Sequence, residues 1–343
     1  MDDNLRKQLE LVQQNTILEV VHGSHAYGTN LPTSDVDIKG VCLIPDKRLF
    51  LGKQGFEQQD GGWETDKVIY HLPKFMQLAG ECNPNIIEML WVDRESILQI
   101  TDAGWKLREA RDVFLSKKAR HTFSGYAHAQ LQRIKAHKRW LDNPPTKPTH
   151  DQFKHRHVLE IGPLGSEEFS AQTRLVRLVR AAGDTERMQI NIGTPPIGSE
   201  IEFQKGIWFD IEVEKYDKTG YEHAMKEYHH YEAWKKGRNE ARAELEAKHH
   251  FDTKHAMHLV RLLRMGWEIM TEGKVLVKRP DAKELLGIRN GEWTYERLVG
   301  YAEELDAKLE EAYQKSTLPY APNWTKIEEL QIELIEEALN GKS

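Results

Sequence analysis

The chain has 343 residues, of which 39% are hydrophobic and 30% charged, and its formal net charge is -6. This length exceeds that of an average domain, so we expect a sizeable core divided into two or three units. No stretch has the length of apolar residues that a membrane span needs, and the N-terminus lacks a signal-peptide pattern. Cys42 and Cys82 are too few for a disulfide framework. These features exclude membrane-spanning and disulfide-rich secreted proteins and predict a soluble protein of the cytoplasm.

The first informative segment is an apolar run that ends in a Gly-Ser turn. Within residues 18–21, Leu18, Val20 and Val21 are apolar and partly β-branched, which favours a short buried strand, and Gly23 and Ser24 break it. Gly23 has no Cβ to block an approaching phosphate, so backbone N–H groups can face the anion, and the Ser24 hydroxyl adds a donor. The segment therefore predicts a binding site for phosphate.

Two acidic residues follow about ten positions later. Asp35 and Asp37 alternate with Val36 and Ile38, so in a strand both carboxylates would lie on one face. Two adjacent carboxylates repel each other, and a hard divalent cation relieves that repulsion because carboxylates are the ligands that Mg²⁺ prefers beside substrate phosphates. The spacing thus predicts a metal site next to the phosphate site.

This pattern of Gly-Ser, a spacer and Asp-apolar-Asp resembles the active-site signature of the DNA polymerase beta superfamily of nucleotidyltransferases. The longer form, residues 23–29 followed by residues 34–40, is similar to the branch associated with RNA ligases and RNA repair. The resemblance implies an α/β (α+β) core with a small mixed sheet. It also implies that Gly23, Ser24 and Ser34 contact the nucleotide.

The superfamily resemblance also calls for a third carboxylate on a neighbouring strand. Asp66 opens an apolar-rich run that is typical of a strand entering a helix, whereas Asp60 and Glu64 begin no such run and are weaker candidates. Residues 83–90 resemble the Asn-Pro…Glu helix of the branch, and Pro84 suits a first helical turn. The resemblance therefore implies that Asp35, Asp37 and Asp66 hold two Mg²⁺ or Mn²⁺ ions.

A second cluster lies far along the chain. Lys254, His258 and Arg261 are spaced i, i+4 and i+7, so they share one face of a helix while apolar residues fill another. Potential cations on one stripe suit a triphosphate, and the stretch resembles the C-terminal helical motif of the same branch. A basic stripe also commonly only solvates a helix or pairs with acidic segments. Both interpretations remain open.

Shifts in the hydrophobic pattern divide the chain into three predicted parts. We expect a catalytic domain over residues 1–115, a basic helical region with a β-hairpin over 116–250, and a helical nucleotide- or substrate-binding domain over 251–343. The hairpin is predicted from two β-leaning runs, residues 188–192 and 207–213. Residues 221–250 favour one long exposed helix that belongs to an inserted arm, and residues 327–339 favour a terminal amphipathic helix.

The middle part carries a local excess of positive charge. Residues 117–156 contain ten Lys or Arg and two Asp or Glu, with Tyr126, Trp140 and Phe153 interspersed. Three more arginines follow at helical spacing: Arg174, Arg177 and Arg180. Such a surface could follow a polyanion such as RNA despite the negative net charge. Plain solvation of a helix explains the pattern equally well.

Together these features predict a nucleotidyltransferase that moves an NMP group from an NTP, with ATP as the expected donor, to a hydroxyl acceptor and releases pyrophosphate. Asp66 is expected nearest the acceptor, where it could take the hydroxyl proton. The branch and the basic middle part favour RNA, either tRNA or an RNA end, as the acceptor. A protein side chain (AMPylation) or a small molecule is the alternative acceptor. A non-catalytic nucleotide- or RNA-binding protein is a further alternative, and loss of a metal carboxylate would be its mark.

Overall fold

A computed structural model describes residues 3–51, 55–161, 185–193, 208–238 and 240–341. The chain divides into two compact units, one made of residues 1–141 and 240–343 and the other of residues 142–239. The first unit therefore contains both the predicted catalytic segment and the predicted C-terminal helical segment. No helix among the described residues combines the length and apolar character needed to cross a membrane.

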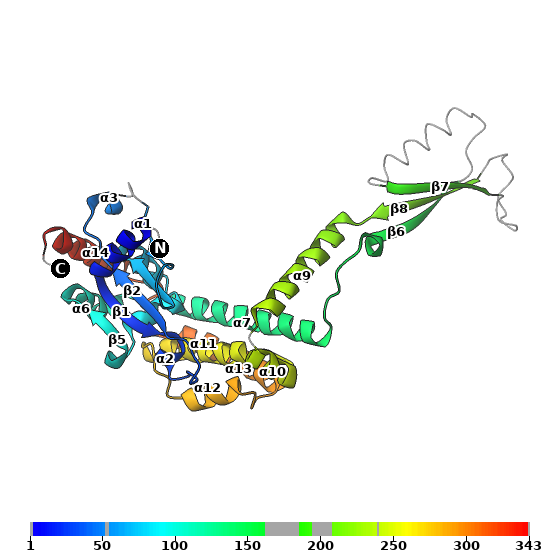
Figure 1. Cartoon of the computed structure of the whole chain (residues 1–343). Coiled ribbons are helices and arrows are strands. Elements are labelled where there is room, and N and C mark those ends of the chain that lie inside the picture. The colour runs from blue at the N-terminus through cyan, green and yellow to red at the C-terminus, as the bar shows by residue number, and fades with distance from the viewer. Residues whose placement is uncertain (1–2, 52–54, 162–184, 194–207, 239, 342–343) are drawn as a thin grey trace. The chain divides into compact units, whose positions relative to one another are not determined.

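The first unit is built on a mixed five-stranded sheet of order β3-β4-β2-β1-β5 (Figure 1). Its central strands are β1 (Thr16–His22), β2 (Asp37–Cys42) and β4 (Lys67–His71), and short strands β3 (Gln58–Gln59) and β5 (Ile97–Ile100) form the edges. Strand β2 runs antiparallel to β1 and parallel to β4. The sheet agrees with the predicted α+β core.

The register of these strands brings three chain segments together at one end of the central strands. His22, the last residue of β1, lies opposite Asp37, the first residue of β2. Ile38 lies opposite Lys67, and the Ile38 N–H donates to the main-chain oxygen of Asp66 at 2.8 Å. The end of β1 and the beginnings of β2 and β4 therefore meet, and Asp37 and Asp66 are direct neighbours.

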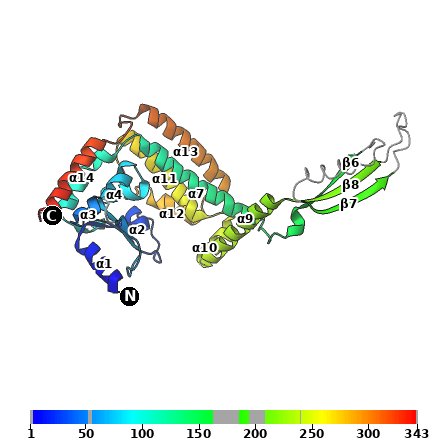
Figure 2. The ribbon, with the colours of Figure 1, turned by 90° about the horizontal axis from the view of Figure 1, so that it is seen from above.

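Most helices of this unit pack in the same hydrophobic core as the sheet. The helix of residues 3–14 instead places Val12 in a smaller cluster, and the described residues of the helix at 240–249 belong to neither cluster. The N-terminal half supplies α1 (Asp3–Gln14), α2 (Gly23–Tyr27), α3 (Lys47–Phe50), α4 (Leu72–Gly80), α5 (Pro84–Ile87), α6 (Asp102–Glu109) and α7 (Lys118–Asp142). The C-terminal part supplies α10 (Glu240–His249), α11 (Thr253–Glu272), α12 (Ala282–Arg289), α13 (Tyr295–Lys315) and α14 (Trp324–Leu339). Figure 2 shows α7, α11 and α13 running alongside one another. The predicted terminal amphipathic helix is α14.

The second unit carries a three-stranded antiparallel sheet of order β6-β8-β7. The predicted hairpin is confirmed, because β7 (Thr185–Gly193) pairs antiparallel with β8 (Trp208–Tyr216). Strand β6 (Lys154–Ile161) was not predicted, because its basic residues resemble the solvated helix that precedes them. Arg174, Arg177 and Arg180 lie outside the described residues.

The single helix predicted over residues 221–250 is wrong. The structure has two helices here, α9 (Lys218–Gly237) in the second unit and α10 in the first. Gly237 has the low helix propensity expected of a terminal residue, and Arg238 leaves the helical conformation at φ -82°, ψ 132°. The charged composition continues across the break and hides it in the sequence.

Candidate active site

The centre of the candidate site is a pair of carboxylates on neighbouring parallel strands. Asp37 opens β2, and Asp66 immediately precedes β4 in matching register, so both side chains project from the same face of the sheet. Burial raises the pKa of Asp37, and the negative charge of the exposed Asp66 raises it further. The charges of His22, Lys39 and Lys254 lower this pKa but do not cancel the rise.

Gly23 lies directly against this pair. It follows β1, opens α2 and has a φ of 63°, a conformation that L side chains rarely adopt. A Cβ built on Gly23 would overlap the carboxylate of Asp37. The predicted turn at Gly23 and Ser24 is thus the start of a short helix, and Gly23 is required there because its backbone touches the acidic pair.

Asp35 lies apart from the predicted arrangement. It was expected on the same strand face as Asp37, but β2 begins only at Asp37, and Asp35 lies in the exposed preceding loop. A turn before it explains the difference, because the Ser34 hydroxyl accepts a hydrogen bond from the Leu31 N–H at 2.8 Å. The prediction that Asp35 shares the strand with Asp37 is therefore wrong, and the Ser34 side chain holds this turn.

A buried hydrogen-bonded network lies beneath the acidic pair. Glu88, which is 0% exposed, accepts hydrogen bonds from the Tyr27 hydroxyl at 2.6 Å and from Nη1 of Arg261 at 2.8 Å. His22 Nε2 lies 3.3 Å from the same carboxylate, and the Arg261 guanidinium stacks 3.9 Å from the centre of the Tyr27 ring. The network joins β1, α2, the turn after α5 and α11.

The charges of this network are balanced inside the protein. Burial by itself would raise the pKa of Glu88, but Arg261 and His22 lower that pKa below its usual range. Burial lowers the pKa of His22, so His22 favours its neutral form. Glu88 is therefore a carboxylate paired with the Arg261 cation, which is 4% exposed. Arg261 is therefore buried in the network beneath the site and is not exposed to solvent.

The other two members of the predicted basic stripe differ from each other. Lys254 is exposed in the first turn of α11, and its charge is close enough to lower the pKa of Asp37. His258 is neutral at physiological pH, because burial and the nearby charges of Arg261 and Lys254 lower its pKa to about 3. Of the stripe, Lys254 is thus the cation that faces the acidic pair.

Three residues of the site were given no role from the sequence. Lys39 lies two positions after Asp37 on the same strand face, and burial lowers its pKa to about 8. Its Nζ donates to the main-chain oxygen of Asn85 at 2.9 Å, which ties β2 to α5. Strand alternation alone could have identified Lys39, and the other two, His22 and Glu88, were visible only as members of the motifs around them.

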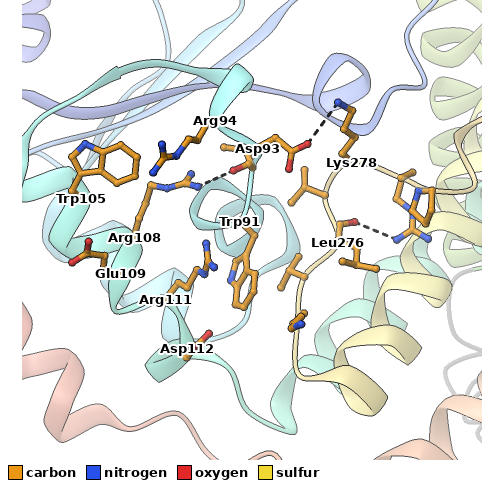
Figure 3. A pocket seen from close by; sticks show the side chains of 16 residues that line it. Trp91, Asp93, Arg94, Trp105, Arg108, Glu109, Arg111, Asp112, Leu276 and Lys278 are labelled. Carbon is orange, nitrogen blue, oxygen red and sulfur yellow. Dashed lines mark hydrogen bonds and ion pairs between the residues drawn. The ribbon is translucent and has the colours of Figure 1, made fainter.

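A basic and aromatic pocket includes residues that lie near the C-terminal end of β1. Its volume is about 1190 Å³, and its walls include Trp91 and Trp105 with Arg94, Arg108 and Arg111 beside them (Figure 3). A fourth arginine, Arg279, also lines it and is paired with Glu268 and Asp281. In β5, which runs antiparallel to β1, Ile97 lies opposite Val20. The residues just before β5 are therefore located at the end of β1 from which Gly23 continues.

The arginines of this pocket stack on its tryptophans. Arg111 lies 4.4 Å from the centre of the Trp91 ring, and Arg94 lies 5.4 Å from that of Trp105. Burial lowers the pKa of Arg108, and the charges of Arg111 and Arg94 lower it further. Among the residues that the structure describes, no carboxylate forms an ion pair with these three arginines. Asp93, Glu109 and Asp112 also line the pocket, which therefore presents cations and flat aromatic rings together with three carboxylates.

Comparison with known proteins finds a family match in the first part of the chain. Residues 1–148 match the family described as the RNA repair pathway DNA polymerase beta family. A curated relative, described as an uncharacterized 38.9 kDa protein in the nrdC-mobD intergenic region of Enterobacteria phage T4, is 26% identical over 129 residues. That alignment covers 34% of this chain and 38% of the relative's length. No solved structure matches the chain.

The first prediction concerns the buried network. Replacing Glu88 with Ala leaves the Arg261 cation buried without its carboxylate, so we expect the free energy of unfolding to fall by about 3–5 kcal/mol. Chemical denaturation followed by circular dichroism measures the change. Glu64→Ala, at an exposed position between β3 and β4, is the matched control and should stay within about 0.5 kcal/mol. Equal stabilities of the two variants would show that the network contributes no support.

Proposed function

Because residues 1–148 match the RNA repair pathway DNA polymerase beta family, we propose that this protein is a metal-dependent nucleotidyltransferase that transfers an NMP group from an NTP to a hydroxyl of RNA. ATP is the expected donor and pyrophosphate the second product. The observation that carries the proposal is the Asp37 and Asp66 pair at the head of two parallel strands, with the Gly23 backbone against it.

The acidic pair has the donor chemistry of a divalent-cation site. Mg²⁺ is commonly bound by one or two carboxylates together with substrate phosphates, and the pKa of Asp37 is raised by burial and by the charge of Asp66, which Lys39 and Lys254 only partly offset. Asp37 and Asp66 would hold Mg²⁺ or Mn²⁺, and Asp35 could join them from its exposed loop as a third ligand. When bound, two such ions neutralise the charge that develops on the phosphates and on the leaving pyrophosphate.

The chain's own groups have separate tasks in the proposed transfer. Gly23 allows the backbone to approach a phosphate, and the Ser24 hydroxyl supplies a donor. Lys254 offers a cation to the β- and γ-phosphates from the start of α11. Asp66 is the exposed member of the pair, so it is positioned to accept the proton of the incoming hydroxyl.

The buried network would keep these groups in register with one another. Glu88 binds Tyr27, the last residue of the helix that Gly23 opens, and it binds Arg261 on the helix that carries Lys254. A rigid connection of this kind supports catalysis because small displacements of reacting groups lower the rate strongly. Arg261 thus acts as a positioning residue in this proposal.

The arginine and tryptophan pocket supports RNA as the acceptor. Single-stranded nucleic acids bind surfaces where bases stack on aromatic rings and phosphates meet cations, and arginine forms bidentate hydrogen bonds with phosphate. The pocket offers both kinds of group at the sheet edge that carries the acidic pair. A protein acceptor would need no such combination.

The central test is nucleotidyl transfer by Asp37→Asn. Neutralising one carboxylate should abolish transfer of label from NTP in the presence of Mg²⁺, with either tRNA or total protein offered as acceptor. It should also leave the metal-free protein at least as stable as the wild type, because the substitution removes the repulsion with Asp66. Asp60→Asn, at an exposed neighbouring position, is the control and should retain activity.

The same assay separates the alternatives. Label on RNA supports the proposal. Label on polypeptide instead identifies a protein-modifying enzyme, and no label with any NTP identifies a non-catalytic binding protein. Full activity of Asp37→Asn contradicts the assignment of the site.

A pair of glycine variants tests the contact between Gly23 and Asp37. Both Gly23 and Gly28 have positive φ, 63° and 73°, so alanine at either position should cost about 1 kcal/mol or more through backbone strain. Only at Gly23 does the new Cβ overlap Asp37, whereas at Gly28 it meets the Ala282 Cβ at 3.7 Å. We therefore expect transfer to fall at least about 100-fold in Gly23→Ala and to change little in Gly28→Ala, measured as kcat/KM. Similar losses of activity in both variants would show that backbone strain, and not the overlap with Asp37, causes the loss.

A double variant tests the pocket. Arg94→Ala with Arg111→Ala removes two cations, so the slope of log affinity for single-stranded RNA against log salt concentration should decrease by about 1.4. Affinity for the NTP should stay unchanged, since neither residue touches the acidic pair. Arg133→Ala with Arg139→Ala, two exposed positions on α7, is the matched control for the basic region predicted from the sequence. A larger effect of the α7 pair would place RNA on that helix and overturn the role of the pocket.

A further inference from the structure

A second group of potential metal ligands lies on helices that the acidic pair does not use. His137, near the end of α7, meets Asp252 and His255 at the start of α11, and one ligand atom from each lies within 4.8 Å of the others. His137 Nδ1 is 3.2 Å from Oδ2 of Asp252, and His255 Nε2 is 3.5 Å from the same oxygen. The Asp252 side chain is 0% exposed and the two imidazoles are 11% and 17% exposed.

The spacing of these atoms is compatible with ligands around a shared ion, and the 3.2 Å contact also has the length of an ordinary hydrogen bond. A hydrogen bond from a nitrogen to a charged carboxylate is commonly about 2.7–2.9 Å long when both partners are charged. Ligand atoms of a tetrahedral ion with bonds of about 2.0–2.1 Å lie about 3.3 Å apart. Both observed separations exceed the first value and lie close to the second.

The Asp252 carboxylate is held in one orientation by the helix that it caps. Its Oδ1 accepts the main-chain N–H of His255 at 3.0 Å and so forms the N-cap of α11, which leaves Oδ2 directed at both imidazoles. Fixed orientation of a ligand by a second hydrogen bond is the arrangement that surrounds many metal sites. The cap and the cluster therefore use different oxygens of one buried side chain.

We propose that His137, Asp252 and His255 bind one divalent transition-metal ion, with Zn²⁺ as the best match, and that a fourth position stays open to water or another ligand. Two imidazole nitrogens and a carboxylate oxygen form a donor set that Zn²⁺ takes, whereas Mg²⁺ prefers oxygen ligands alone. The site is thus chemically distinct from the acidic pair. The ion would fasten α7 to the first turn of α11, where Lys254 lies between two of the ligands.

Binding of Co²⁺ and Zn²⁺ to the full-length protein tests the proposal. After treatment with a chelator, we expect one equivalent of Co²⁺ to produce the visible absorption bands of a tetrahedral site, and Zn²⁺ to displace it. Zn²⁺ should also raise the Tm, because it binds the folded state. Asp252→Asn keeps a good N-cap residue but loses the anionic ligand, so it should fold and bind Co²⁺ at least about 100-fold more weakly. His137→Gln should show the same loss.

Two controls make the outcome decisive. His229→Gln with His230→Gln removes an exposed histidine pair, and Asp37→Asn with Asp66→Asn removes the acidic pair. Both variants should retain the Co²⁺ bands. The proposal is overturned if the wild type produces no tetrahedral spectrum, if folded Asp252→Asn retains it, or if either control variant loses it. None of these readouts depends on nucleotidyl transfer, so the proposed function and the metal site stand or fall separately.

Discussion

The ion pair between Glu88 and Arg261 is the constraint on which the candidate site depends. It joins a residue of the N-terminal half to a helix of the C-terminal part, and it is fully removed from water. A buried carboxylate is tolerated only where cations and hydrogen-bond donors surround it, and here Tyr27 and Arg261 meet that need. Tyr27 ends α2, the helix that Gly23 opens. Its hydrogen bond to Glu88 therefore also holds the backbone of α2 at the site.

The acidic pair above this network has the opposite character. Asp37 and Asp66 lie side by side, and the charges of Lys39 and Lys254 only partly offset the burial and the repulsion that raise the pKa of Asp37. Carboxylates placed in this way make sense as a site that a ligand completes. The residues of the buried network therefore act as positioning residues, and the residues of the acidic pair are those proposed to meet the substrate.

Local spacing was sufficient to predict the residues that lie close together in the chain. Gly23 and Asp37 were identified from local patterns, whereas Asp66 was identified because the superfamily resemblance calls for a third carboxylate at the start of a strand. Asp35 was misplaced on the strand because alternation of polar and apolar residues continued into a turn that Ser34 stabilises. The hairpin of β7 and β8 followed from β-leaning runs, whereas β6 resembled the basic helix before it.

Contacts between distant segments could not be predicted in this way. The helical spacing of Lys254, His258 and Arg261 was real, but periodicity says which residues share a face and not what that face meets. Arg261 meets a carboxylate, and burial together with nearby cations lowers the pKa of His258, so of the three residues Lys254 is the exposed cation whose charge acts on Asp37. The cluster of His137 and Asp252 joins residues 115 positions apart, and nothing in the local sequence marks either as a partner of the other.

The order in which the ribosome makes these partners has its own consequence. Glu88 emerges 173 residues before Arg261, with the whole second unit between them. At translation rates of about 5–20 residues per second, the carboxylate waits roughly 10–35 seconds for the cation that allows it to leave water. Tyr27 and His22 are already made by then, so the step that must wait for Arg261 is the neutralisation of the Glu88 charge.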